Sequence, residues 1–403
     1  MASAASGKKA GSPKKTTAWQ GVFAGFCASL VGIGLARFAY TPLLPAIIDA
    51  HWFGASAAAY LGAANLAGYL LGALLGRPLA DRVTPTRALR GMMLLAAISF
   101  FACSWPISFS WFFAWRLLAG ASGGVLMVLA APAVMPRVPP ARRGLAGGII
   151  FMGVGMGVAA SGTLVPLLLQ KGLGLAWVGL GALSLALTLI AWRGWQADGD
   201  GAAPRHGDAP PRLRPLRALY IEYGLNAAGW VPHMIFLVAF IAHGLGQGLR
   251  AGAEYWVLFG IGATAGPVLA GAIADRIGFG RALRFAFLLE IFGVAIPAVS
   301  SGSAWLMASS VIVGAFVTGT VPLVLGRIHE LLAHFPSHRD AAWRAATVGF
   351  ALCQAAAAYG LSYVFSQSQG NYRLLFGIGG LAMALALALD MAANRVRLRR
   401  VGE

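Results

Sequence analysis

Long apolar segments alternate with short charged gaps along this 403-residue chain. A helix needs about 20 apolar residues to cross a bilayer, and segments of this size recur from end to end. They lack the ten-residue alternation typical of membrane β-barrels, so each is predicted to be a helix that satisfies its own backbone hydrogen bonds in lipid. The expected spans are 19–42, 55–76, 88–104, 109–131, 145–168, 174–192, 217–242, 253–274, 282–299, 303–325, 344–366 and 372–393.

One of the charged gaps occurs twice. Residues 80–90 and 274–284 both read A-D-R-x4-R-A-L-R, and Asp81 and Asp275 stand 194 residues apart (275 − 81). Each copy follows the second expected span in a group of six. A repeat of this length in so apolar a chain is typical of the duplicated bundles of secondary transporters. The predicted fold is an all-α membrane protein with twelve transmembrane helices in two pseudo-symmetric six-helix bundles.

Polar segments divide the chain into five parts. Residues 1–18 are expected to be a disordered tail that is too hydrophilic for a signal-peptide core. Residues 194–216 are rich in Gly, Ala, Pro, Asp and Arg and read as a linker. The bundles are then 19–193 and 217–394, with a second tail at 395–403.

Composition and charge support a membrane location. The chain is 58% hydrophobic and 11% charged, whereas soluble domains carry about 25% charged residues. A net charge of +18 would suggest nucleic acid as the partner of a soluble protein. Here most Lys and Arg residues fall in alternate connections, so the positive-inside rule places both termini in the cytoplasm and no nucleic-acid partner is expected. The expected partners are a small-molecule substrate, a proton and the lipid bilayer, and a monomer is expected.

The repeated loop also carries a family resemblance. Its second copy is similar to the G-x-x-x-D-R-x-G-x-x-R signature of the major facilitator superfamily, with Gly271, Asp275, Arg276, Gly278 and Arg281 in place. The first copy keeps Asp81, Arg82 and Arg87 but has Arg77 and Thr84 where glycines are expected. The resemblance covers essentially the whole chain, and residues 32–45 most resemble the YbfB/YjiJ-like subgroup. It implies alternating access, with these two loops in the cytoplasmic gate.

Two further motifs lie inside spans and imply close helix packing. Arg116, Gly120 and Gly124 are similar to a fourth-helix motif linked to proton-coupled members of the superfamily. Gly153, Gly157 and Gly162 partly fit the fifth-helix antiporter pattern. Small residues let helix backbones approach closely in lipid.

The seventh span carries a polar stripe. Glu222, Asn226, Gly229, Trp230 and His233 follow at i, i+4, i+7, i+8 and i+11, which places them on one helical face. We expect this face to line a cavity, with Glu222 and His233 as candidate proton carriers and Trp230 able to stack on a cation. The alternative is that Glu222 pairs with a loop arginine and that His233 forms a hydrogen bond between helices.

Two arginines lie within spans, where each costs about 2.5–3.5 kcal/mol to insert at the centre. Arg37 has Tyr40 and Thr41 as helical neighbours, and Arg116 lies in the fourth span. A guanidinium presents a planar fork suited to carboxylate, so both arginines are candidates for binding an anionic substrate. The alternative is a structural network in which each neutralises a carboxylate or caps backbone carbonyls. Glu290, in the ninth span, is expected to have a structural or interfacial role.

Three functions remain open at this point. The first is proton-coupled export or exchange of an organic anion, and the second is efflux of lipophilic cations by way of Glu222 and Trp230. The third is a membrane receptor or assembly protein that uses the same scaffold without transport. The chain has neither a phosphate-binding loop nor a hydrolase motif, so an enzyme is not expected. We expect no cofactor and no metal, and the family resemblance implies a bacterial inner membrane.

Overall fold

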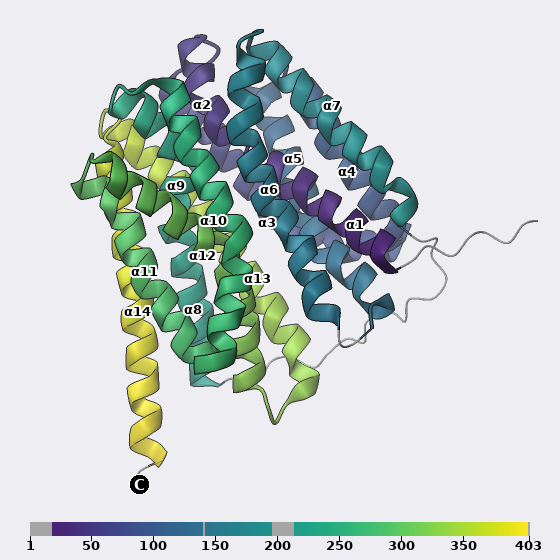
Figure 1. The fold of residues 1–403 in the computed structure, drawn as a ribbon, viewed down its shortest axis with the longest axis vertical. Coiled ribbons are helices and arrows are strands. Elements are labelled where there is room, and N and C mark those ends of the chain that lie inside the picture. Colours follow the sequence, from purple (N-terminus) through teal and green to yellow (C-terminus); the bar gives the residue numbers. More distant parts are fainter. Residues whose placement is uncertain (1–17, 140–141, 196–212, 402–403) are drawn as a thin grey trace, which may run out of the picture.

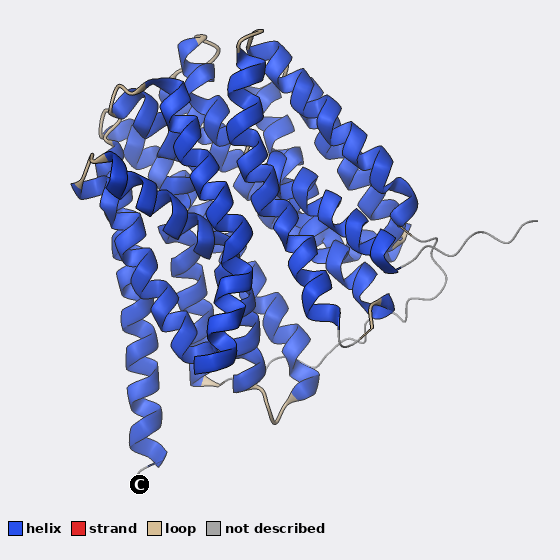
Figure 2. Cartoon of the chain, viewed as in Figure 1, coloured by secondary structure: helices blue, strands red, loops and turns tan. Residues whose placement is uncertain are grey.

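The computed structural model describes residues 18–139, 142–195 and 213–401, and the regular elements of these residues are helices (Figures 1 and 2). In the N-terminal half, the first span consists of α1 (Ala18–Ser29), the π-helix η1 (Leu30–Leu35) and α2 (Tyr40–Asp49). The next five spans are α3 (Ala55–Val83), α4 (Pro85–Ala102), α5 (Phe109–Val134), α6 (Arg143–Leu169) and α7 (Leu173–Ala191). Figure 1 shows this half, in purple to teal, beside the C-terminal half, in green to yellow.

The C-terminal half repeats this order. Its first span consists of α8 (Arg214–Gly229), α9 (Val231–Ala239) and the π-helix η5 (Phe240–Gly244). The next five are α10 (Gly248–Ile277), α11 (Phe279–Val299), α12 (Ser303–Leu331), α13 (Arg339–Gln367) and α14 (Tyr372–Val401). The all-helical fold with twelve spans is thereby confirmed. Among the described residues, eleven spans are long and apolar enough to cross a membrane by length and composition alone, and α4 falls short because Arg87 and Arg90 in its first turns lower its hydropathy.

The first and seventh spans differ from the continuous helices expected over 19–42 and 217–242. Residues 36–39 form turns between η1 and α2, and α8 ends at Gly229, one residue before Trp230. Pro232 is the second residue of α9, where its missing N–H costs nothing because the first turn of a helix has no intrahelical acceptor. The sequence predicted helices here from hydrophobicity, which does not register such breaks.

The ends of two helices also differ from the expected boundaries. Helix α8 begins at Arg214, inside the expected linker 194–216, because Pro215 has its φ preset for the first turn. Helix α14 continues to Val401, through most of the expected tail 395–403, since arginines are good helix formers and favour helix C-termini. Residues 1–17 of the expected N-terminal tail and residues 196–212 of the linker lie outside the described residues.

Glycines at equivalent positions of the repeat allow close helix packing within each half. Gly68, Gly72 and Gly120 recur 194 residues later as Gly262, Gly266 and Gly314. A Cβ atom at Gly68 would overlap the backbone oxygen of Leu117, and one at Gly266 would overlap that of Ala315. Backbones in direct contact explain why α3 packs closely on α5, and α10 on α12, without large side chains between them.

The turns of the two signature loops share one backbone conformation. Thr84 has φ 79° and ψ 145°, and Gly278, its equivalent, has φ 84° and ψ 150°. This region is open to glycine but costs another residue about 1–3 kcal/mol. The Thr84 hydroxyl is also buried without a hydrogen-bond partner.

A Thr84→Gly variant is therefore expected to be more stable than the wild type by about 1 kcal/mol, after the entropic cost of an added glycine is subtracted. The thermal midpoint of the purified protein measures the effect. The converse change, Gly278→Thr, should lower the midpoint. A Thr84→Gly variant that melts below the wild type would show that the turn is not strained.

Candidate functional site

Arg37 occupies the centre of the interface between the halves. It lies in the turn of the first span and is 8% exposed. Its Nε and Nη2 contact the sulfur of Met234 in α9 at 3.3 and 3.2 Å, and Nη2 also donates to Oε1 of Gln354 in α13. Both partners belong to the opposite half and both are uncharged. Within the described part of the chain, no carboxylate forms an ion pair with Arg37.

Aromatic rings surround this guanidinium. Its central carbon lies 4.8 Å from the ring centre of Tyr69 in α3 and 5.8 Å from that of Trp230. The ring of Phe38 is 5.2 Å away. Aromatic faces attract a cation through their electron-rich π-systems, which lowers the cost of burying the charge. A buried cation is thus stabilised by polarisable and neutral groups from four spans, the first, second, seventh and eleventh, and no fixed countercharge is present among them.

Arg116 has a different environment inside the N-terminal half. Its Nη1 donates to the backbone oxygen of Ala36 at 2.9 Å, and its guanidinium lies 4.3 Å from the ring of Tyr40. The Nδ2 of Asn65 donates to the same oxygen at 3.2 Å. The turn at 36–39 takes this carbonyl out of a regular helix, and Arg116 and Asn65 supply the donors it needs. This matches the carbonyl-capping alternative, and the structure does not direct Arg116 and Arg37 at a shared space.

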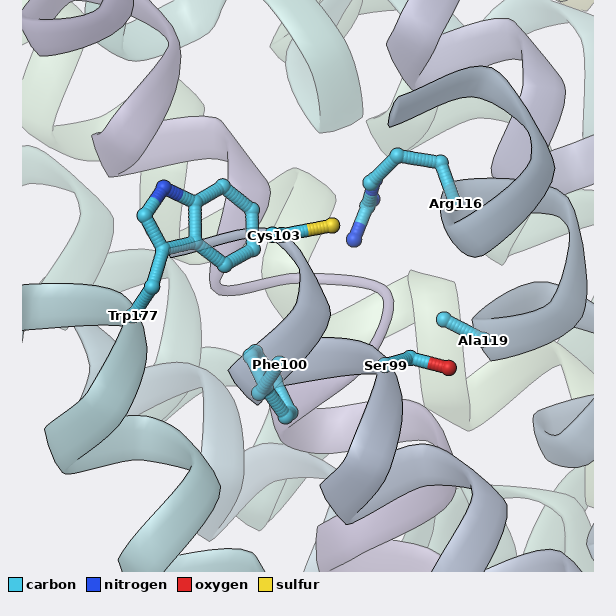
Figure 3. A pocket seen from close by; sticks show the side chains of 6 residues that line it. All are labelled: Ser99, Phe100, Cys103, Arg116, Ala119 and Trp177. Carbon is cyan, nitrogen blue, oxygen red and sulfur yellow. The ribbon is translucent and has the colours of Figure 1, made fainter. Parts of the chain in front are cut away.

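A narrow crevice borders Arg116 on its other side. Ser99, Phe100, Cys103, Arg116, Ala119 and Trp177 line it, and it is too tight to hold a water molecule. Figure 3 shows the Cys103 sulfur directed toward the Arg116 side chain, with the Trp177 ring behind it. The crevice is a packing gap between α4, α5 and α7, and it is no substrate cavity.

The polar stripe of the seventh span does not face one common space. Asn226 of α8 donates from Nδ2 to Glu290 Oε2 in α11 at 2.7 Å. His233 of α9 contacts the hydroxyl of Ser309 in α12 at 2.8 Å through Nε2. Trp230, between them in sequence, faces Arg37 and packs on Phe350 of α13. Because the helix breaks at Trp230, only this residue of the stripe reaches the interface near Arg37.

Glu222 is buried inside the C-terminal half, where it is 2% exposed. The charged groups that act on it electrostatically are Asp390, Arg327 and Arg284. Arg284 itself pairs with Asp390 of α14. Glu222 therefore stands beside a charged cluster of α11, α12 and α14 and does not face the Arg37 interface.

The signature loops lie at one end of the molecule, which we call the basic end. Asp81 and Asp275 are both exposed, and in the described ranges neither carboxylate forms an ion pair. The flanking basic residues of the signature are exposed as well: Arg82, Arg87, Arg276 and Arg281. Gly271 has no atom within 4 Å of a Cβ position, so close packing does not require a glycine there.

The last arginine of each signature loop has a partner that the sequence pattern did not reveal. Arg90 donates to the backbone oxygens of Trp192 and Trp195, just after α7, at 2.8 and 3.2 Å through Nη2. Its equivalent Arg284 pairs with Asp390 of α14. Both arginines therefore fasten the third span of a half to its sixth. Their equivalent positions in the repeated sequence were the one signal that could have pointed to this shared role.

The opposite end of the molecule is closed between the halves. Helix α2 packs on α9 across the interface. At the ends of these two spans, His243 Nε2 lies 2.9 Å from Asp49 Oδ1. Thr41 of α2 also donates to the backbone oxygen of Met234 in α9.

The five motif glycines all lie at points where another backbone or side chain comes very close. A Cβ at Gly120 would overlap the oxygen of Asn65, and one at Gly124 the oxygen of Tyr69. The corresponding neighbours of Gly153, Gly157 and Gly162 are Phe26, Gly34 and Val257. The first four glycines bring α5 and α6 against α3 and the first span, whereas Gly162 contacts α10 of the other half.

The duplicated six-span halves, the broken first and seventh spans and the cationic centre between them define a membrane transporter of the major facilitator superfamily. The fold agrees, since the structure superposes on a variant of the nucleoside transporter NupG with a TM-score of 0.73, covering 93% of this chain and 99% of that one at 16% identity. The chain belongs to the family described as uncharacterised MFS-type transporter YbfB, which matches residues 29–391. It is therefore a multi-pass membrane protein of a transporter family and not of an enzyme family.

A curated relative supports the same class. The chain is 29% identical over 267 residues to the probable transporter SCO4007 of Streptomyces coelicolor. This match covers 63% of the chain and 61% of that relative, so the chain spans less than two thirds of the relative's length.

Proposed function

We propose that this protein is a secondary active transporter that exports or exchanges a small organic anion in a proton-coupled cycle. The observation that supports it is Arg37, a buried cation between the halves without a carboxylate partner among the described residues. A charge-assisted bond to a carboxylate is roughly twice as strong as a bond to a neutral acceptor. A substrate carboxylate would therefore replace the Met234 sulfur and the Gln354 amide as the partner of Arg37.

The remaining features of the proposal follow from the sequence. Glu222 and His233 are the candidate proton carriers in the seventh span, and no cofactor is needed. We propose that both termini lie in the cytoplasm, which the arginine-rich connections support, and that the protein is a monomer in a bacterial inner membrane. Arg116 contributes to the anion site by supporting the turn that carries Arg37.

The efflux of lipophilic cations is less well supported by the contacts. Trp230, which would stack on such a cation, already faces the Arg37 guanidinium, and that positive charge would repel the substrate. Glu222, the expected countercharge, lies by the Arg284 and Asp390 cluster. A receptor without transport is less well supported, because the chain belongs to a transporter family.

Transport by the purified protein in proteoliposomes tests the proposal. A panel of labelled mono- and dicarboxylates would be loaded inside, and efflux measured with and without an inward proton gradient. We expect efflux of at least one acid to accelerate when the gradient is imposed. Gradient-driven efflux of lipophilic cations, with none of any acid, would refute the anion proposal.

The signature loops are proposed to close the basic end in the opposite conformation. In this structure α2 and α9 meet at the far end, while Asp81 and Asp275 are exposed at the basic end. Alternating access requires the two ends to close in turn. The charges at Asp81 and Asp275 are then free here and engaged after the change of state.

An Asp275→Asn variant is therefore expected to slow transport about fivefold or more while its thermal stability in this conformation stays unchanged. Contacts that shift a conformational equilibrium contribute about 1–3 kcal/mol, which corresponds to a change of about fivefold or more in the transport rate. Counterflow rates in proteoliposomes and the melting midpoint measure the two quantities. Glu254→Gln is the matched control, since Glu254 is an exposed acid near the other end of the same helix. Wild-type counterflow in Asp275→Asn would remove the gate role.

A further inference from the structure

Glu290 is an acid completely enclosed by helices. It lies midway along α11 and is 0% exposed. Asn226 of α8 donates to its Oε2 at 2.7 Å, and within the described residues no basic side chain forms an ion pair with it. An ionised carboxylate enclosed without a countercharge is strongly disfavoured, whereas a neutral carboxyl group needs only hydrogen bonds.

Two polar atoms of this pair lack a partner, and both belong to the same two side chains. They are Glu290 Oε1 and Asn226 Oδ1. In an ionised carboxylate both oxygens only accept, so neither leftover atom can satisfy the other. A protonated carboxyl group has one O–H donor, and a proton on Oε1 would be donated to Asn226 Oδ1. A single proton thus completes a two-bond ring between carboxyl and amide.

The internal repeat shows that packing at this position does not require an acid. Glu290 corresponds to Ala96 of α4 (290 − 194), which is also 0% exposed. Helix α4 packs on α5 and α7 in the same way that α11 packs on α12 and α14. The N-terminal half therefore fills the equivalent place with a methyl group, and the acid in the C-terminal half has another purpose.

We propose that Glu290 and Asn226 form a proton-binding site in the C-terminal half, and that the proton is bound in the conformation seen here. This inference rests on the proposed proton coupling and assigns the transported proton to Glu290 in place of the candidates Glu222 and His233. Loss of the proton would set a charged carboxylate against the amide oxygen of Asn226, so the pair would have to open.

The site is placed to influence the substrate region. Asn226 stands four residues before Trp230, at which the seventh span breaks and contacts Arg37. The backbone oxygen of Gly229 lies directly against Gly379 of α14, so a shift of α8 relative to α14 moves the break. Release of the proton would thus shift the seventh span, and this shift would move Trp230 relative to Arg37.

The surrounding helices carry other titratable and charged groups. Glu222 precedes Asn226 by one turn on α8, toward the basic end, and is the nearest acid along that helix. The groups on the packed elements include Glu222 and Tyr223 on α8, His233 on α9, Asp275 and Arg276 on α10, Arg284 on α11, Arg327 on α12 and Asp390 on α14.

Infrared spectroscopy of the purified protein in lipid nanodiscs tests the assignment directly. At neutral pH the wild type should show the C=O band of a protonated carboxyl group, shifted in D₂O, and Glu290→Gln should lose it. Glu222→Gln, which removes the other candidate proton carrier of this half, should keep the band. A wild type without the band, a band that persists in Glu290→Gln, or its loss in Glu222→Gln instead would overturn the proposal.

A second variant keeps the test decisive if Glu290→Gln does not fold. Asn226→Leu retains the acid but removes the amide, so the band should move to the frequency of a carboxyl group without a hydrogen-bonded partner. An unmoved band would overturn the pairing. In transport, Glu290→Gln should retain counterflow of solute but lose acceleration by a proton gradient. If the wild type transported no anion, the proposed function would fail but the proton site would not, since the infrared result does not depend on a substrate.

Discussion

An Arg37→Gln variant is expected to fold and to lose binding and transport of organic anions. Removing one partner of a buried charge pair costs about 2–5 kcal/mol, of which each 1.4 kcal/mol is a factor of ten in affinity. The apparent affinity for the anion should therefore fall by roughly thirtyfold or more. The fold should survive, because glutamine can still bond to Gln354 and the interface no longer has to bury a charge.

Efflux from proteoliposomes at varied internal substrate concentration measures this effect. Arg37→Lys should give an intermediate loss, since it keeps the charge but not the two-pronged geometry. Arg250→Gln controls for the loss of one positive charge, because Arg250 is almost fully exposed. Transport by Arg37→Gln at the wild-type concentration dependence would exclude Arg37 from the substrate site.

A Gly120→Ala variant is expected to be destabilised by about 3 kcal/mol or more, the upper range for overpacking. The added methyl group would overlap the backbone oxygen of Asn65, and neither helix backbone can move aside without losing its neighbours. Displacing Asn65 would also disturb its bond to the Ala36 carbonyl, which supports the turn of the first span.

The melting midpoint of the purified variant, with its yield in the membrane, measures this loss. Gly360→Ala is the matched control, because Gly360 lies in α13 with nothing within 4 Å of a Cβ position. That change should be neutral or stabilising by up to about 1 kcal/mol, the difference in helix propensity. Equal midpoints for the two variants would contradict the close-packing role of Gly120.

The number of spans could be predicted because apolar length and loop charge are properties of the chain itself. The duplication was visible in the repeat of Asp81 and Asp275, and the structure adds Arg90 and Arg284 as anchors. The breaks in the first and seventh spans could not be predicted from hydrophobicity, because a broken helix and a straight one are equally apolar.

The partners of the site residues were beyond the sequence for a related reason. Spacing places Asn226, Trp230 and His233 on one helical face, but the break at Trp230 turns that residue toward Arg37 and leaves the others against α11 and α12. The acceptor of Arg116, the Ala36 carbonyl, is available only because the first span unwinds. Met234 carries no pattern that would single it out, and Gln354 stands out only as a polar residue inside an apolar span, which predicts no particular partner.

Binding of ligands to the purified wild type tests directly whether Arg37 binds an organic anion. Thermal stability would be measured against a panel of organic acids and a panel of lipophilic cations. A ligand at 100 times its dissociation constant stabilises the folded state by about 2.7 kcal/mol, which is readily detected. Anion binding at Arg37 predicts stabilisation by at least one acid, lost in Arg37→Gln. Stabilisation by cations alone, lost in Glu222→Gln and kept in Arg37→Gln, would contradict it.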